Sequence, residues 1–235
     1  MAIEPEVYPL AYEGEVPEGA LELLDAEFGE GYAWKGFDQL YYAGEAVGHF
    51  ALAEDGTCAG VCLGRYMTAQ ETEWWANAVG LPEFRDVLMS TVETLAVHPS
   101  HRGRRLGSSL VDGMIDTLLQ DERLHAGYPS VLMANCWIRP SSCSEPLFLR
   151  AGFTVRGRVF DFWTERSRDG SFDCPVDRIP CHCTISNVIR EIEQPEVRIS
   201  SNIKLRRAGT NIFGEMEHAP LRTMMTRRLR KPTED

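Results

Sequence analysis

Apolar residues recur along the chain at spacings that predict helices and strands between residues 19 and 163. Over 104–120, Leu106, Leu110, Met114 and Leu118 fall on one helical face, as expected of an amphipathic helix that covers a core. A shorter helix is predicted over 19–29 and ends at Gly29. The other predicted elements are a hairpin over 47–66 with an Asp55-Gly56 turn, a short helix or loop over 71–79, strands over 87–97, 130–138 and 153–163, and a short helix over 142–151.

This order of elements predicts an α/β fold, with a mixed sheet and helical crossovers. The composition changes after Arg166, where a stretch rich in Cys, Pro, Asp and Gly is followed by a basic segment. We therefore expect one domain over 1–166. A Cys-containing loop and a basic C-terminal extension would then occupy 167–235.

Composition narrows the classes of function. The 235 residues are 43% hydrophobic and 25% charged, as is usual for soluble globular proteins. No apolar run is long enough to cross a bilayer, and the acidic first residues do not resemble a secretory signal, so we expect a cytoplasmic protein with no membrane partner. The net charge is −11 although the segment from residue 200 onward is basic. The strongly acidic remainder disfavours nucleic acid as a partner.

The segment over 91–109, TVETLAVHPSHRGRRLGSS, carries the clearest chemistry. A predicted strand ends at Val97, a loop follows, and a helix begins after the basic stretch. The first N–H groups of a helix have no partner within the helix and bind phosphate oxygens. Arg102, Arg104 and Arg105 add charge suited to a diphosphate. The alternative is a basic turn that only starts a helix.

This segment resembles the acetyl-CoA-binding motif of the GNAT superfamily of N-acetyltransferases, Arg/Gln-x-x-Gly-x-Gly/Ala. Arg102 and Gly107 match its first and last positions, whereas Arg105 replaces the central glycine. A second resemblance lies downstream, where Phe148-Leu149-Arg150-Ala151-Gly152-Phe153 is similar to the family's Tyr-x-x-x-Gly-Phe. The resemblance covers roughly residues 19–163. It implies a mostly antiparallel central sheet flanked by helices, and transfer of an acetyl group from acetyl-CoA to a primary amine in a ternary complex.

The resemblance also implies roles for particular residues. Backbone groups of Leu95, Ala96 and Val97 would bind the pantetheine arm and the acetyl carbonyl. Ser141 stands where the family often has an asparagine that contacts pantetheine. The diphosphate would be held by Arg102, Gly103, Arg104, Arg105, Leu106, Gly107 and Ser108.

Glu93 is the candidate general base, because an amine must lose its proton before it attacks a thioester. It sits in an otherwise apolar predicted strand, where burial would raise its pKa. The alternative is a glutamate on the exposed face, paired with an arginine. His98 is a rival base.

Phe148 stands where the family commonly has a tyrosine that protonates the leaving thiolate. Water, Ser144 or Cys143 would have to serve instead, or the thiolate leaves unassisted. The loss of this proton donor keeps open a second interpretation, a catalytically weak CoA-binding module that regulates or engages a partner.

The acceptor is expected to be a small-molecule or peptide amine, and the sequence leaves open a homodimer. Residues 4–30 are rich in glutamate and contain no basic residue, which would suit a cationic acceptor. A solvated acidic face is the simpler interpretation of this segment.

A cluster of possible metal ligands follows the predicted domain. Cys174, Asp177, Cys181 and Cys183 form a Cys-x2-Asp-x3-Cys-x-Cys set, with His182 as a fifth donor. Thiolate, carboxylate and imidazole are zinc ligands, so the spacing suggests a structural zinc ion. The alternative is a set of reduced thiols packed under a loop. A metal-dependent nucleic-acid-binding protein is a further alternative, which the acidic charge of the chain opposes.

Overall fold

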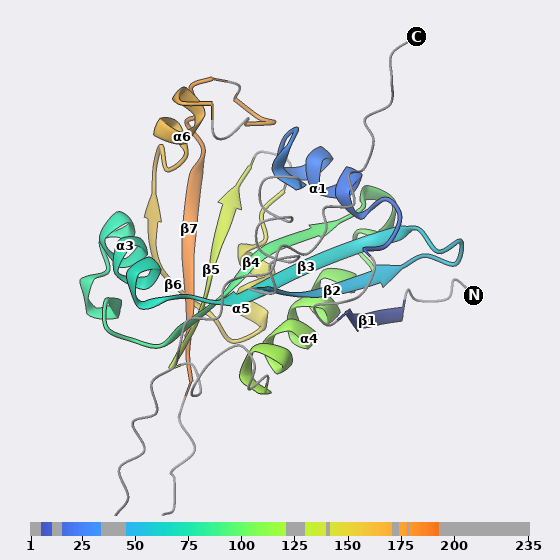
Figure 1. The fold of residues 1–235 in the computed structure, drawn as a ribbon, viewed down its shortest axis with the longest axis horizontal. Helices are drawn as coiled ribbons and strands as arrows, with labels where there is room; N and C mark the ends of the chain where they lie inside the picture. The colour runs from blue at the N-terminus through green and yellow to red at the C-terminus, as the bar shows by residue number, and fades with distance from the viewer. Residues whose placement is uncertain are drawn as a thin grey trace, which may run out of the picture. The chain divides into compact units, whose positions relative to one another are not determined.

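The computed structural model describes residues 6–10, 16–33, 46–120, 130–139, 142–170, 174–177 and 179–192. Within these ranges, seven strands form one sheet in the order β1-β2-β3-β4-β5-β7-β6 (Figure 1). The strands are β1 (Glu6–Leu10), β2 (Ala46–Leu52), β3 (Cys58–Tyr66), β4 (Met89–Val97), β5 (Val131–Ile138), β6 (Thr154–Val159) and β7 (Thr184–Glu191).

Neighbouring strands are antiparallel except for one pair. β4 and β5 run parallel, and their register joins only Met89 to Val131, Ser90 to Leu132 and Thr91 to Met133. β5 pairs along its whole length with the antiparallel β7 on its other side. The predicted mixed, mostly antiparallel sheet is therefore confirmed.

Helices cover both faces of this sheet (Figure 1). On one face, α4 (Leu106–Gln120) and α5 (Glu145–Arg150) pack on the largest apolar cluster, which includes Leu110, Met114 and Leu118. On the other face, α1 (Ala20–Phe28) packs on Phe50 and Val61. The remaining helices are α3 (Ala69–Val79), the short α6 (Thr164–Arg168), and the 3-10 turns η2 (Pro82–Phe84) and η3 (Pro99–His101).

Local sequence signals account for several element ends. The Asp55 carboxylate accepts hydrogen bonds from the backbone N–H and the hydroxyl of Thr57 in the hairpin turn. Gly56 there has the predicted positive φ of 85°. α3 begins with a capping box, in which the Thr68 hydroxyl accepts from Glu71 N–H and the Glu71 carboxylate accepts from Thr68 N–H. This capping box begins a helix over 69–79. Of the short helix or loop predicted over 71–79, the structure therefore has the helix.

The sheet continues beyond the boundary placed at residue 166. Strand β7 lies between β5 and β6, so residues 184–191 belong to the same sheet as β4. β6 also ends at Val159, short of the predicted 163, and α6 follows it. The sequence of β7 does not show the run of apolar residues expected of a buried strand, because its buried interior includes the polar Ser186 and Asn187. Residues 193–235, which hold the expected basic extension, lie outside the described residues.

None of the helices in the described ranges is both long and apolar enough to span a membrane.

Candidate functional site

A cavity of about 940 Å³ opens where β4 and β5 separate. The two strands stop pairing after Thr91 and Met133. Beyond that point both contribute side chains to the cavity, among them Glu93 from β4 and Trp137 from β5. The cavity extends to the loop before α4, to the end of α1 and to α5. The divergence of one parallel strand pair thus creates a binding cleft within the sheet.

Glu93 lies in a β-bulge that turns its side chain to the cavity. In the pairing of β3 with β4, Leu63 faces Thr94 and Gly64 faces Val92, so Glu93 is the extra residue. Its side chain is 33% exposed and its Oε2 lies 3.3 Å from Nε of Arg65. The expected burial of Glu93 is therefore wrong, because the bulge turns the carboxylate to the open cleft. The alternative of a pairing with an arginine is correct, and the same carboxylate also lines the cavity.

The loop before α4 presents backbone N–H groups to the cavity. Ser109 N–H donates to the Arg105 carbonyl at 3.1 Å, so the N–H groups of Leu106, Gly107 and Ser108 precede the first hydrogen bond of the helix. All three residues line the cavity. The positive end of the helix dipole faces the same space, which suits an anion.

Arg105 has the backbone conformation that a glycine adopts most easily. Its φ is 63°, in the left-handed region, and Gly103 nearby has a φ of 77°. Arg105 therefore reproduces the turn that the motif's central glycine would make, at some cost in backbone strain.

The arginines of this loop do different things. Arg102 Nε donates to the Val97 carbonyl at 2.9 Å, and its guanidinium also bonds to the Glu27 carboxylate. Its side chain thus ties the loop to β4 and α1. Arg105 is exposed and lines the cavity, whereas Arg104 is exposed but does not line it. Arg150 of α5 also lines the cavity. Sequence reasoning did not select Arg150, although it lies within the second motif.

Gly107 allows close packing of α4 against its neighbours. A Cβ at this position would lie 2.9 Å from Cδ1 of Leu147 in α5, and 3.6 Å from Cγ2 of Val97. A larger residue would therefore displace α5 as well as crowd the cavity. Ser141, the remaining residue expected to contact the cofactor, lies outside the described residues.

The opposite end of the cavity combines aromatic rings with an ion pair. The Arg139 guanidinium stacks 3.8 Å from the centre of the Trp137 ring and 5.4 Å from that of Phe28. Arg139 Nη1 also lies 3.7 Å from Oε2 of Glu27. Burial lowers the pKa of Arg139, and Glu27 opposes this change. Sequence reasoning missed this group because its members come from α1 and from the end of β5 and the residue after it, which are distant from α1 in the chain.

Two candidate proton donors stand near Phe148. The Phe148 ring is buried, lines the cavity and meets Phe153 edge to face, with 5.2 Å between ring centres. Cys143 and Ser144 line the cavity beside it. His98, the rival base, does not line the cavity, and its Nδ1 lies 2.7 Å from the Ser100 hydroxyl.

Tyr32 is a further hydroxyl near Glu93. It hydrogen-bonds to the Thr94 hydroxyl at 2.6 Å. Burial raises its pKa, as does the nearby charge of Glu93, so its phenol stays protonated at neutral pH. Tyr32 does not line the cavity, and we assign it a structural role.

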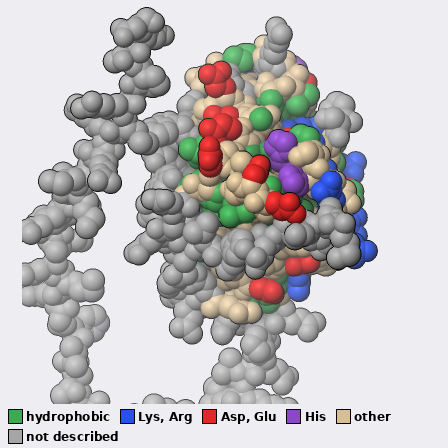
Figure 2. Space-filling model, turned by 90° about the vertical axis from the view of Figure 1, so that its right-hand side faces the viewer, with side chains coloured by type: hydrophobic (Ala, Val, Ile, Leu, Met, Phe, Trp, Pro, Cys, Tyr) green, Lys and Arg blue, Asp and Glu red, His purple; other side chains and the backbone are tan. Residues whose placement is uncertain are grey.

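Charge is segregated on one face of the molecule. Figure 2 shows acidic side chains gathered along one side of this face and arginine or lysine side chains along the opposite edge, with histidines between them. The net acidic composition therefore does not produce a uniformly acidic surface.

The expected metal ligands come together in space. The ligand atoms of Cys174, Asp177, Cys181 and Cys183 all lie within 4.8 Å of one another. His182, the fifth donor considered, instead directs Nδ1 to Oδ1 of Asp161 at 2.9 Å.

A cleft between parting strands thus faces the N-terminus of α4, an arrangement that suits an anionic ligand. The chain matches the model of the Acetyltransferase (GNAT) family over residues 18–135, about half of its length, and it belongs to that family. It is thus an acetyltransferase, and acetyl-CoA is the donor that this membership supports. No curated protein matches the sequence.

Solved structures of acetyltransferases share the fold. A chain of the NatC complex bound to Gag peptide and CoA is 18% identical, with a TM-score of 0.53, over 81% of this chain and 100% of its own. Arabidopsis thaliana NAA60 with a bisubstrate analogue is 13% identical, with a TM-score of 0.52 and coverages of 81% and 100%. The same plant protein with acetyl-CoA gives 14% identity, a TM-score of 0.51 and coverages of 80% and 98%. At these identities the likeness concerns the fold alone.

Proposed function

We propose that this protein is an N-acetyltransferase that moves the acetyl group of acetyl-CoA to a primary amine by direct attack in a ternary complex. The observation that carries the proposal is the continuity of one cavity. It joins the N–H groups at the start of α4 to the carboxylate of Glu93. A donor anchored by its diphosphate at one end would therefore present its thioester near a base.

The pantetheine arm would lie along the free side of β4. Ala96 pairs with Val61 and Val97 with Gly60 on the β3 side. On the β5 side, the pairing of β4 ends at Thr91. Apart from the Val97 carbonyl, which accepts from Arg102 Nε, backbone groups of Leu95, Ala96 and Val97 that point toward β5 are thus available to an extended ligand, which would bind much as an added strand does.

Glu93 would accept the proton of the attacking amine, directly or through a water molecule. The neutral nitrogen then attacks the thioester carbonyl, a C–N bond forms, and the C–S bond breaks as the tetrahedral intermediate collapses. The CoA thiolate takes a proton from water, Ser144 or Cys143, since Phe148 has none to give. Pairing with Arg65 holds the Glu93 carboxylate in place on the bulge.

The acceptor would enter past Phe28, Trp137 and Arg139. Aromatic rings pack well against alkyl chains, so Phe28 and Trp137 would suit the apolar stem of an amine. The NatC structure was solved with a peptide, and we include peptide α-amines beside small amines and polyamines as acceptors to be tested.

Glu93→Gln tests the proposed base. We expect kcat to fall by about 10²–10⁴-fold, with little change in the Kd of acetyl-CoA measured by calorimetry. Glu71→Gln is the matched control, because Glu71 also pairs with Arg65, at 2.9 Å, but does not line the cavity. Unchanged turnover in Glu93→Gln would remove Glu93 as the base.

Phe148 favours a second candidate function, a CoA-binding module of low activity. Its phenyl ring occupies the cavity wall where a phenol would donate a proton. Saturable binding of acetyl-CoA without turnover across the amine panel would support this candidate over the first.

A further inference from the structure

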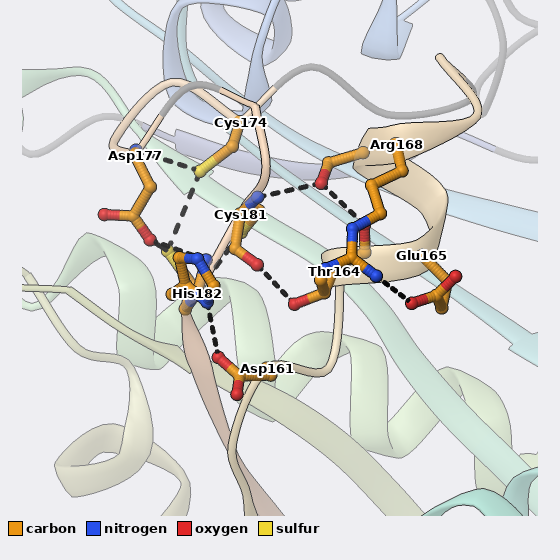
Figure 3. Close-up of polar contacts among 10 residues, drawn as sticks. Asp161, Thr164, Glu165, Arg168, Cys174, Asp177, Cys181 and His182 are labelled. Carbon is orange, nitrogen blue, oxygen red and sulfur yellow. Dashed lines mark hydrogen bonds and ion pairs between the residues drawn. The ribbon is translucent and has the colours of Figure 1, made fainter.

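We propose that Cys174, Asp177, Cys181 and Cys183 bind one structural zinc ion at the junction of α6 and β7. Figure 3 shows this region, in which Cys174, Asp177 and Cys181 lie close together. The four potential ligand atoms all lie within 4.8 Å of one another. Three thiolates and one carboxylate complete a tetrahedron, as in structural zinc sites.

The distances within the cluster fit a tetrahedral ion. Two sulfurs bound to one zinc at 2.3 Å lie about 3.8 Å apart, and the Sγ atoms of Cys174 and Cys183 are 3.7 Å apart. A sulfur and a carboxylate oxygen on the same ion lie about 3.5 Å apart, whereas Cys183 Sγ and Asp177 Oδ2 are 3.1 Å apart. Separating Cys183 Sγ from Asp177 Oδ2 by a few tenths of an ångström would bring this pair to the expected distance, and the other ligand atoms, all within 4.8 Å of one another, would draw in around the ion.

Backbone groups around the cluster favour charged sulfur. The N–H groups of Val176 and Asp177 point at Cys174 Sγ, at 3.4 and 3.2 Å. Cys183 N–H points at Cys181 Sγ at 3.4 Å. Hydrogen bonds donated to sulfur stabilise a thiolate over a neutral thiol, and a thiolate is the form that binds a metal.

Helix α6 fixes the position of Cys181 from outside the ligand set. The Ser167 hydroxyl accepts from Cys181 N–H at 2.8 Å, and the Thr164 hydroxyl donates to the Cys181 carbonyl. Both hydroxyl residues are buried, and Figure 3 shows the Thr164 contact. Such outer contacts orient the ligands of metal sites.

His182 stands apart from the ligands. Its ring bonds to Asp161, away from the sulfurs (Figure 3), while its backbone N–H donates to Asp177 Oδ2 at 3.0 Å. The set therefore closes at four ligands with no position left for substrate, which is the pattern of a structural site.

Two metal-free states are the alternatives. Reduced thiols could pack as small apolar groups, because Cys174, Cys181 and Cys183 are buried beside Trp137. Such packing accounts for the buried sulfurs, whereas the exposed Asp177 brings one carboxylate oxygen to 3.1 Å from Cys183 Sγ, as a fourth ligand would. A disulfide would need sulfurs about 2.05 Å apart and would leave the third cysteine unused.

The proposed ion would also support the wall of the acetyltransferase cavity. Trp137 contacts the cysteine cluster and lines the cavity. Binding would displace the three thiol protons, so each chain would exchange three protons for one zinc ion. The loop over 174–183 would then be fastened to β5, and the Trp137 ring held against Arg139.

The test is the metal content of the full chain purified without chelator. We expect elemental mass spectrometry to find about one zinc ion per chain. Exchange for cobalt should give the thiolate charge-transfer band and the strong visible bands of a tetrahedral site. Cys183→Ser and Asp177→Asn should lose most of the metal. Cys143→Ser, an exposed cysteine outside the cluster, and His182→Ala should keep it.

Ser167→Ala retains every ligand. It therefore tests the site even if the variants that lack a ligand fail to fold. It should weaken zinc affinity by about 10–100-fold in a chelator competition, and chelator should lower the Tm of the parent chain. A folded protein that carries no zinc, gives no cobalt spectrum and has all seven cysteines open to alkylation after denaturation would overturn the proposal. An intact mass lower by a pair of hydrogens would overturn it in favour of a disulfide.

Discussion

Replacing Arg105 by glycine should stabilise the protein while weakening its hold on acetyl-CoA. Arg105 has a φ of 63°, and a non-glycine residue in that region bears about 1–2 kcal/mol of strain. Glycine removes the strain but has more freedom to lose on folding, about 0.5–1 kcal/mol. The net expected gain is about 0.5–1 kcal/mol, or a rise in Tm of about 1–4 °C for a chain of this size.

The same change removes a cation from the cavity. Arg105 is exposed, so its pairing with a phosphate should be worth about 0.2–1 kcal/mol. We therefore expect the KM for acetyl-CoA to rise by about 1.4–5-fold. Stability is read from urea unfolding and affinity from initial rates and calorimetry.

Two control variants separate conformation from charge. Arg105→Lys keeps both the charge and the strain, so it should behave nearly as the parent. Arg104→Gly lies next to it at an ordinary φ and outside the cavity, so it should lose about 0.5–1 kcal/mol of stability with an unchanged KM. If Arg105→Gly is destabilised as much as Arg104→Gly, the strain argument fails.

Three further predictions concern the cavity and the core. Phe148→Tyr places a hydroxyl on the cavity wall and should raise kcat, by up to about 100-fold if thiolate protonation limits the rate. An unchanged kcat would show that thiolate protonation does not limit the rate. Burial lowers the pKa of His49, whose Nε2 bonds to Thr117. As pH falls, the histidine of the unfolded chain therefore takes up a proton before that of the folded chain. The free energy of unfolding should then decrease as pH drops below about 6.5. His49→Gln should flatten that urea-unfolding profile. Leu118→Ala, at a fully buried position, should cost about 2–5 kcal/mol by the same measurement.

Much of the fold followed from local patterns in the sequence. The face of α4 that carries Leu110 and Leu118 is apolar at helical spacing, and the Asp55-Gly56 pair favours a hairpin turn. These signals depend on residues a few positions apart, so a single sequence displays them. The motif from Arg102 to Gly107 likewise located the start of the helix and, through the family, the reaction class.

Other features arose only when distant segments met. Strand β7 is buried through its neighbours β5 and β6 despite Ser186 and Asn187 in its interior, so no local hydrophobic period marks it. Glu93 lost its expected burial because a bulge, which is a property of strand pairing, turned it to the cleft. Trp137 and Arg139 reached Phe28 and Glu27 through the packing of α1 near the end of β5.

The sequence by itself determined which residues could do chemistry, since side-chain donors, charges and thiols are fixed by residue type. The tertiary structure decided which of them act together. It turned His182 away to Asp161 and opened a cleft where β4 leaves β5. Each of these depends on the relative placement of elements that are separated in the chain, and only the packing of the whole sheet fixes that placement.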